Sequence, residues 1–385
     1  MNQGPAMNQS FRPVWAEVDL DAIGHNVRAL IGVAAAAELL AVVKANAYGH
    51  GAVPVARSAV EAGATWLGVA LVEEGVELRD AGIDARILVL SEPVPSAAAE
   101  VVARGLTPVV YTANGIEALA KAVADAGASR PLAVHLKVDT GMHRVGCSPD
   151  DAIALVEGIE ARSELELEGV CTHLAVADEP ANPYTGEQLD RFDALLDVLH
   201  ARTRVPPLVH AANSAGAIAH PRARYNLVRC GIALYGIPPS PALAGRVKLQ
   251  PALSLKAKVT HTKPLAAGAS VSYGRHFTAA ADTHVVTVPV GYADGVPRGL
   301  GLVGGEVLIG GRRRRIAGAV TMDQLVVDMG EMPGGSEISA GLEVVLIGRQ
   351  ADEEITAGEW AARLGISPYE VTTRIGPRVP RKYLP

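Results

Sequence analysis

Lys44 is the first residue whose type and position could do chemistry. It follows the apolar run Leu39–Val43, a predicted buried strand, and it precedes Gly49 and Gly51. A lysine at the end of a buried strand is poorly hydrated, so its pKa should fall and its amine should become suited to Schiff-base chemistry. A lysine that merely extends its amine to solvent is the alternative, because this position alone does not separate the two.

A second group of charged residues, Lys137, Asp139 and Arg144, ends another predicted strand. Buried charges need either one another or a ligand, so a structural ion network and a binding site are both open here. His173 follows the next strand, but no second histidine stands at a metal-ligand spacing. No metal site is therefore predicted.

Polar and small residues also end two later strands. Asn213 and Ser214 lie in a segment that nearly matches a nucleophile elbow, but Ala212 replaces its first glycine. They suit a phosphate held at a helix N-terminus, and Gly231 permits close backbone approach nearby. Barrels often hold phosphate after strands seven and eight. A lysine at one strand end and phosphate donors at two others predict a phosphorylated aldehyde cofactor.

The elements that must position these residues alternate between short apolar runs and amphipathic segments up to Gly236. This alternation predicts a parallel sheet, and about eight repeats predict a (β/α)8 TIM barrel. An open doubly wound sheet competes, but no Gly-x-Gly-x-x-Gly turn supports it. The predicted strands are Leu39–Val43, Trp66–Leu71, Arg86–Leu90, Thr107–Tyr111, Ala133–Val138, Leu167–Thr172, Leu208–Ala211 and Asn226–Ile232.

The pattern changes after about Pro238. Alternating β-type segments separated by Gly and Pro predict a mostly β domain. We therefore expect a barrel over residues 13–240 and a β domain over residues 241–385. Residues 1–12 are a candidate further segment of the β domain. The expected strands include Leu253–His261, His284–Val290, Gly305–Ile309, Arg315–Val320, Leu325–Asp328 and Glu343–Ile347, with one helix near Ala357–Leu364. The basic run Arg312–Arg315 is predicted to be a solvated turn or strand edge.

Composition excludes several classes of protein. The 385 residues carry a formal charge of −6, which argues against general nucleic-acid binding. The three cysteines are widely spaced and form neither a disulfide framework nor a metal pattern. The polar N-terminus lacks the apolar core of a signal peptide, and the run Val33–Val43 is too short to span a membrane. We expect a cytoplasmic protein that binds neither nucleic acid nor membrane.

Taken together and in order, many segments of the chain resemble the alanine racemase family, from about Trp15 to Pro380. The resemblance implies a barrel, a β domain and a head-to-tail homodimer with shared active sites. The matching segments are Ala41–Gly51, Lys137–Gly146, Thr172–Glu179, Ala212–Gly216, Val228–Gly236, Ser272–Gly274, Gly291–Gly295, Met322–Gln324 and Tyr369–Val371.

The same resemblance implies the catalytic roles. Lys44 would bind pyridoxal 5'-phosphate as a Schiff base and then serve as one of two bases. Tyr273, from the other subunit, would be the second base, because racemisation removes a proton from one face of the α-carbon and returns one to the other. A tyrosine base needs nearby positive charge at neutral pH, since its ordinary pKa is about 10.

Cofactor contacts are implied at several further positions. Arg229 would face the pyridine nitrogen, and because a guanidinium yields no ready proton the ring would be a weaker electron sink. His173 would lie beside the ring, and Asn213 would support the phosphate site. The residues implied at the phosphate are Tyr48, Ser214, Gly231, Ile232 and Tyr369.

Substrate contacts are implied at Arg144, Met322 and Tyr292, with Asp323 supporting the Met322 loop. Lys137 matches a position that is carbamylated in some members of the family. Two positions depart from the family's pattern: Thr321 stands where several relatives carry cysteine, and His143 stands where others carry small residues.

The predicted function is interconversion of L-alanine and D-alanine, which supplies D-alanine for peptidoglycan. A racemase of broader specificity, or one for serine or basic amino acids, is the nearer alternative. A non-catalytic pyridoxal-phosphate carrier is more distant, because a carrier has no use for a second base in a β domain. A decarboxylase of similar plan would need a different acid–base set.

Overall fold

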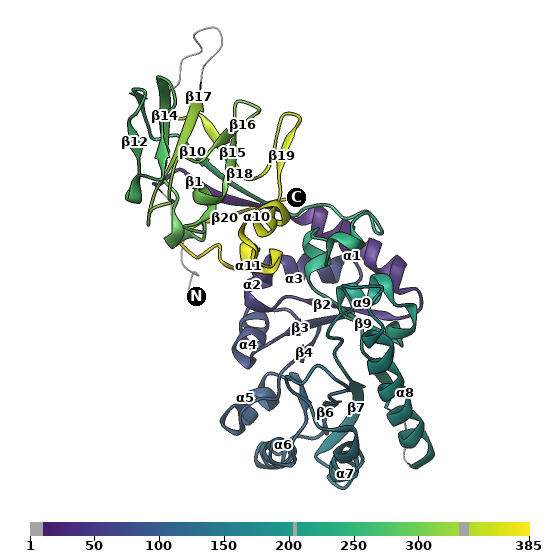
Figure 1. Ribbon diagram of the computed structural model, residues 1–385. Helices are drawn as coiled ribbons and strands as arrows, with labels where there is room; N and C mark the ends of the chain where they lie inside the picture. The colour runs from purple at the N-terminus through teal and green to yellow at the C-terminus, as the bar shows by residue number, and fades with distance from the viewer. Residues whose placement is uncertain (1–10, 203–205, 331–338) are drawn as a thin grey trace. The chain divides into compact units, whose positions relative to one another are not determined.

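The computed structural model describes residues 11–202, 206–330 and 339–385 of the chain (Figure 1). Contacts divide it into two compact units. The barrel unit consists of residues 21–47 and 51–250, and the β unit consists of residues 1–20, 48–50 and 251–385. Each unit is described by itself.

The barrel unit contains eight parallel strands in the order β8-β7-β6-β5-β4-β3-β2-β9. The ring is nearly closed, because β8 and β9 are joined only by single bonds such as that from the Arg229 amide to the Ala212 carbonyl, at 3.0 Å. This confirms the predicted barrel. Its strands are β2 (Glu38–Val42), β3 (Trp66–Val69), β4 (Arg86–Val89), β5 (Thr107–Val110), β6 (Leu132–Lys137), β7 (Leu165–Cys171), β8 (Leu208–His210) and β9 (Leu227–Cys230).

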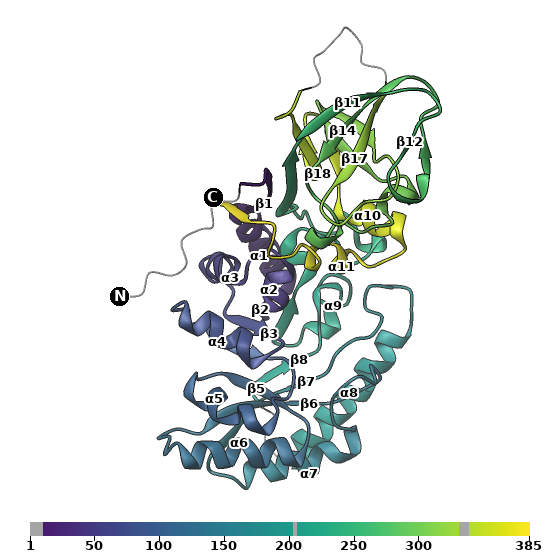
Figure 2. The ribbon, with the colours of Figure 1, turned by 90° about the vertical axis from the view of Figure 1, so that its left-hand side faces the viewer.

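Amphipathic helices cover the outside of these strands, as α5 to α8 show (Figure 2). In α6 the buried residues Ile116, Leu119 and Val123 recur at helical spacing, and the Thr112 hydroxyl caps the first turn. No helix among the described residues is long and apolar enough to cross a membrane. The helices are α1 (Leu20–Ala34), α3 (Ala52–Glu61), α4 (Val72–Asp80), α5 (Ala98–Ala103), α6 (Ala113–Asp125), α7 (Pro149–Glu160), α8 (Tyr184–Arg202) and α9 (Ser214–Ala219).

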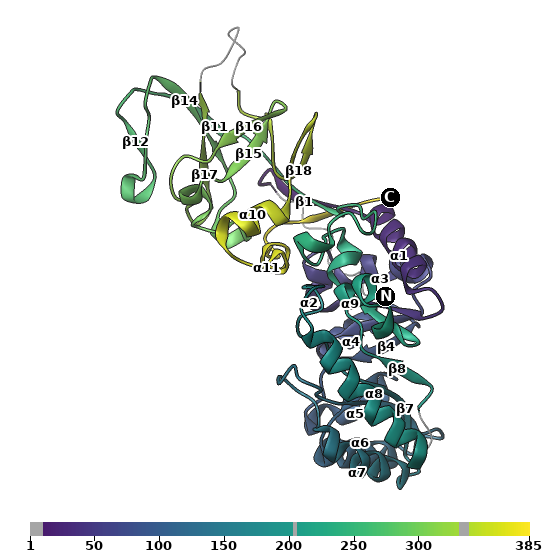
Figure 3. The same cartoon turned by 45° about the vertical axis from the view of Figure 1, so that its right-hand side comes forward.

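The β unit is built on a main sheet in the order β16-β15-β18-β10-β1-β20. Strand β1 pairs antiparallel with β10 and parallel with β20. A smaller sheet joins β11, β14 and β17, and two helices, α10 and α11, lie side by side (Figure 3). The elements used below are β1 (Val14–Asp19), β10 (Leu253–Lys258), β11 (His261–Leu265), β14 (Thr283–Val288), β15 (Glu306–Ile309), β16 (Arg312–Arg315), β17 (Leu325–Gly330), β18 (Glu343–Gln350), β20 (Arg381–Leu384), α10 (Ala357–Leu364) and α11 (Pro368–Thr373).

The predicted strand Arg315–Val320 is wrong in position. Gly310 and Gly311 both adopt positive φ, which closes a two-residue hairpin and starts β16 directly at Arg312. The basic run Arg312–Arg315 is therefore a strand at the edge of the main sheet. Of the two predicted possibilities, a solvated turn or a strand edge, the second is confirmed.

The division between the units also differs from residues 13 and 240. It falls near residues 20 and 250, because β1 takes its partners from the β unit and the chain up to Gln250 still contacts the barrel unit through Asn26.

Candidate active site

Four cationic side chains gather where the barrel strands end. Lys44 follows β2, Lys137 ends β6, Arg144 lies in the loop after β6, and Arg229 lies on β9. None of them forms an ion pair with a carboxylate of any residue that the structure describes. Such a concentration of unpaired positive charge is costly unless an anion binds there.

These cations lie close enough together to shift the pKa values of the two lysines. Burial and the charge of Arg144 lower the pKa of Lys44, with Glu74 acting in the opposite direction. Burial also lowers the pKa of Lys137, and the charges of Arg229, Arg144 and Lys44 lower it further. Both amines are thus shifted toward the neutral, nucleophilic form that the sequence predicted for Lys44.

The backbone after the first lysine turns in a left-handed sense. Residues 45–48 all have φ between 50° and 54°, a conformation that costs about 1–2 kcal/mol for each non-glycine residue. The Glu74 carboxylate holds the turn by accepting from the Ala45 amide at 2.6 Å, and the Asn46 side chain accepts from the Ala52 amide at 2.8 Å. Sequence reasoning missed both the turn and Glu74, although Gly49 and Gly51 were a signal of unusual backbone.

Arg229 is buried, and both of its terminal nitrogens have hydrogen-bond partners within the barrel unit. Its Nη1 donates to His210 Nδ1 at 2.7 Å, and its Nη2 lies near the carbonyls of Thr172 and Ala211 and, at 3.2 Å, near His173 Nδ1. Its Nε has no hydrogen-bond partner among the described residues. Nε is not among the fully buried side-chain atoms that lack a partner, so it stays reachable and can donate to an acceptor such as a pyridine nitrogen. Burial also lowers the pKa of His173, so its imidazole is neutral.

The predicted phosphate residues of the barrel lie together. Ser214 begins α9, and the Asn213 side chain caps this helix by accepting from the Gly216 amide at 2.9 Å. The Ser214 hydroxyl accepts from the amide of Gly231 at 2.8 Å, directly before Ile232. A hydroxyl and backbone amides that converge in this way can bind a phosphate.

The loop that carries Arg144 is tied down at several points. Asp139 Oδ1 accepts from the amides of Gly141 and His143, and His143 adopts φ 54°. From α8, the Tyr184 hydroxyl donates to the Gly141 carbonyl at 2.9 Å. Sequence reasoning missed Tyr184, which carries no motif and is found only through the fold.

In the β unit, Tyr48 and Tyr369 have ring centroids 5.7 Å apart. Burial raises the pKa of Tyr48, so its hydroxyl stays protonated and can donate a hydrogen bond. Tyr369 lies in the first turn of α11, whose N-cap is Ser367.

The remaining predicted residues of the β unit lie on exposed loops. Tyr273 is 70% exposed, Met322 53% and Tyr292 42%, which is unusual for side chains of this size. The Tyr292 amide donates to the Thr321 carbonyl at 3.0 Å, so the Tyr292 and Met322 loops are joined. The neighbouring Asp323 accepts from Arg378 at 2.7 Å.

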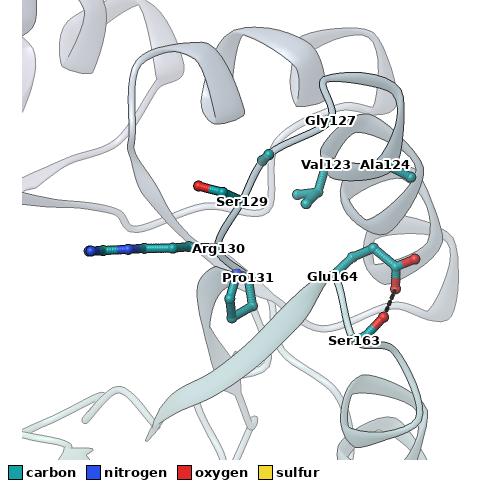
Figure 4. Close-up of a pocket in the computed structure, with 9 residues that line it drawn as sticks. Val123, Ala124, Gly127, Ser129, Arg130, Pro131, Ser163 and Glu164 are labelled. Atoms are coloured by element: carbon teal, nitrogen blue, oxygen red, sulfur yellow. Dashed lines mark hydrogen bonds between the residues drawn. The ribbon is translucent and has the colours of Figure 1, made fainter.

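A surface cavity of about 340 Å³ lies elsewhere, at the amino ends of β6 and β7 (Figure 4). Pro131 and Glu164 line it, and Arg130 extends away from the other lining residues. It contains no nucleophile or cation pair of the kind described above. Because barrel chemistry occurs at the carboxyl ends of the strands, this cavity is not the active site.

The fold and the site together define a class of protein, namely a barrel enzyme with a lysine of lowered pKa after its first barrel strand and a second, mostly β unit. Comparison with known proteins agrees. Residues 18–239 match the family described as alanine racemase, N-terminal domain, and residues 252–383 match alanine racemase, C-terminal domain.

Individual relatives cover nearly the whole chain. The alanine racemase of Symbiobacterium thermophilum is 50% identical over 373 residues, 97% of each chain. The crystal structure of alanine racemase from D-cycloserine-producing Streptomyces lavendulae is 42% identical with a TM-score of 0.91, covering 98% of both chains. A histidine racemase of Leuconostoc mesenteroides is 33% identical with a TM-score of 0.87, covering 99% of this chain and 100% of that one. The chain belongs to the alanine racemase family, a family of isomerases.

Proposed function

We propose that this chain interconverts L-alanine and D-alanine with pyridoxal 5'-phosphate held in the barrel, and so supplies D-alanine for peptidoglycan. The observation that carries the proposal is the group of four cations that includes Lys44, none of which forms an ion pair with a carboxylate of the described residues. The Nε of Arg229 likewise has no hydrogen-bond partner among those residues. A phosphorylated pyridine aldehyde and an amino-acid carboxylate would satisfy both features.

When bound, the cofactor supplies an electron-withdrawing ring that acidifies the α-proton of an attached amino acid. Lys44 holds it through its Nζ and accepts or returns a proton on one face of the α-carbon. Arg229 would donate from Nε to the ring nitrogen and would keep its own proton, because the pKa of a guanidinium stays high. His173, whose Nδ1 lies 3.2 Å from Arg229 Nη2, would lie beside the bound ring.

The phosphate of the cofactor would be held by hydroxyls and backbone amides. Asn213 orients the segment by capping α9. The phosphate contacts we assign are Tyr48, Ser214, Gly231, Ile232 and Tyr369.

Five residues complete the proposed substrate site. Arg144 steers the carboxylate of the amino acid, and the Met322 amide receives it, with Asp323 supporting that loop. Tyr292 lines the approach to the site. Tyr273 acts as the second base on the opposite face of the α-carbon.

We further propose that the active enzyme is a homodimer in which Tyr273 of one copy serves the Lys44 site of the other. The high exposure of Tyr273, Tyr292 and Met322 supports an interface at these loops. A cytoplasmic location stays a prediction from the sequence.

The test is chiral chromatography of the purified protein incubated with L-alanine, with and without added pyridoxal phosphate. D-Alanine should appear, disappear in Lys44→Ala and nearly disappear in Tyr273→Phe. The same assay with serine and histidine sets the substrate range, since a histidine racemase shares the fold. Cofactor absorption without D-alanine would overturn the alanine assignment.

A further inference from the structure

A line of polar side chains crosses the interior of the barrel behind Arg229. Its Nη1 lies 2.7 Å from His210 Nδ1, and His210 Nε2 lies 2.8 Å from His135 Nδ1. His135 Nε2 lies 3.3 Å from a Glu168 carboxylate oxygen, and Arg86 pairs with the other oxygen. The line therefore runs from the active-site end of β9 to the first residue of β4.

The direction of every hydrogen bond in this line is fixed by its ends. A guanidinium can only donate, so His210 Nδ1 must accept and its proton must be on Nε2. That proton is donated to His135 Nδ1, which leaves the His135 proton on Nε2, facing Glu168. A carboxylate can only accept, so both ends impose the same order.

The charges agree with that order. Burial lowers the pKa values of His135 and His210, so both imidazoles are neutral. Burial raises the pKa of Glu168, but the hydrogen bond from His135 and the charge of Arg86 outweigh it and hold the carboxyl ionised. Glu168 is thus a counter-charge for the buried Arg229, transmitted through two polarised imidazoles.

The barrel also makes room for this line. A Cβ on Gly169 would stand 2.5 Å from His135 Nδ1, although the φ of Gly169 is not positive. The glycine is therefore required by the imidazole rather than by the backbone. On its other side His135 packs edge-on against Trp66, over which the Arg86 guanidinium stacks at 3.7 Å.

We propose that Arg86, Glu168, His135 and His210 form a positioning relay that fixes one tautomer of His210 and thereby holds the Arg229 guanidinium with its Nε aimed into the active site. The identity of the group that meets Nε, the cofactor's ring nitrogen, rests on the proposed function. In the opposite tautomer His210 would present an N–H to the Nη1 N–H of Arg229, and the guanidinium would lose one partner and turn.

The first test is nitrogen NMR of protein labelled with ¹⁵N-histidine, since protonated and bare imidazole nitrogens have distinct shifts. His210→Gln and His135→Gln assign the two resonance pairs. The relay requires that both rings in the wild-type protein carry their proton on Nε2, with and without pyridoxal phosphate. A proton on Nδ1 of either ring, or a charged ring at neutral pH, would overturn it.

The second test reverses the relay without deleting a ring. In Glu168→Gln, Arg86 keeps the amide oxygen, so the amide NH2 turns to His135 and forces the proton of each imidazole onto Nδ1. In Gly169→Ala the new methyl displaces the His135 ring. Glu166→Gln, an exposed position on the same strand, removes the same charge outside the relay.

Titration of each apoprotein with pyridoxal phosphate, followed by fluorescence, supplies the second readout. We expect affinity to fall about tenfold in Glu168→Gln and Gly169→Ala, as for one lost hydrogen bond to a charged group, with kcat reduced and the KM for alanine little changed. Melting temperatures identify any variant that fails to fold. If a variant does not fold, the histidine tautomers measured in the wild-type protein decide whether the relay exists. Wild-type tautomers and affinity in both variants would overturn the relay.

Racemisation by the wild-type protein is measured separately. If D-alanine does not form but the tautomers and the cofactor affinity respond as expected, the proposed function fails and the relay stands. If D-alanine forms but neither variant differs from Glu166→Gln, the relay fails and the proposed function stands.

Discussion

At the scale of single residues, the distinguishing feature of the candidate site is a group of cationic side chains that form no ion pair with a carboxylate of the described residues. Lys44 lies close enough to Arg144 to feel its charge, and Lys137 feels the charges of Arg144, Arg229 and Lys44. A neutral lysine amine is a nucleophile toward aldehydes and toward carbon dioxide alike. The same physical situation therefore supports two different modifications at two neighbouring lysines.

We expect Lys137 to be carbamylated, because a carbamate would place a negative charge among these cations. Incubation with ¹³C-bicarbonate should give a carbamate resonance at neutral pH that is absent in Lys137→Ala and present in Lys121→Ala, a change at an exposed lysine. Acidification should remove the resonance, since the amine is then protonated. No resonance in the wild-type protein would contradict the prediction.

Acid should destabilise the barrel unit, because burial lowers the pKa values of His135, His173 and His210. In the unfolded chain these imidazoles bind protons below about pH 6.5, whereas the folded unit keeps them neutral. Stability is therefore full above that pH and is lost as pH falls below it, by up to about 1.4 kcal/mol per pH unit for each histidine.

Urea unfolding at several pH values between 7.5 and 5 measures this slope. His210→Asn should make the slope shallower, while His200→Asn, at an exposed position of α8, should leave it unchanged. Equal slopes in all three proteins would show that the buried histidines are not responsible.

At the scale of elements, regular strands and helices were predictable and irregular backbone was not. Apolar runs bounded by Gly and Asp located all eight barrel strands to within a few residues, and α10 was predicted with its observed bounds. The left-handed turn at residues 45–48 was missed, because two alanines and a tyrosine disfavour that conformation and Asn46 is the one member that favours it. It persists through tertiary partners such as Glu74, which local sequence does not reveal.

The residues of the candidate site likewise fall into two groups, those that could be predicted from the sequence and those that could not. Polar residues at strand ends, such as Lys44 and Ser214, could be found from position alone. The relay residue His135 lies mid-strand, and Glu168 follows a pattern of alternating acidic residues that is equally typical of an exposed strand. Their pairing depends on which strands are neighbours and on a register shift between β6 and β7.

Glycine should be favourable in the left-handed turn at residues 45–48, although it is unfavourable inside a right-handed helix. Ala45→Gly should stabilise the protein by about 0.5–1 kcal/mol, since relief of the strained φ exceeds the entropy that glycine adds to the unfolded chain. Ala118→Gly, inside α6, should destabilise it by about 1 kcal/mol. Chemical denaturation of both variants checks the opposite signs, and a loss of stability in both would show that the turn is not strained.

At the scale of the whole molecule, the proposed pairing of Lys44 with a partner's Tyr273 predicts complementation. Lys44→Ala and Tyr273→Phe should each be inactive alone. Mixed dimers would contain one intact site, so exchange of subunits should restore about a quarter of wild-type activity. The racemisation assay measures it after the two variants have been unfolded and refolded together.

The control is the same mixture without exchange, which should stay inactive. A double variant carrying both changes, refolded with wild-type chains, should give mixed dimers without any intact site. Failure of the single variants to complement, despite exchange seen by native mass spectrometry, would place both bases in one chain.

The position of β1 between β10 and β20 has a consequence for how the chain is made. Residues 14–19 leave the ribosome before the barrel does, yet their partners at 253–258 and 381–384 follow only after the entire barrel has been made. The barrel strands, by contrast, mostly pair with the strand made just before them. The barrel can therefore close during translation while the apolar strand β1 lacks its partners, and β1 is exposed to chaperones and to wrong partners until β10 and β20 have been made.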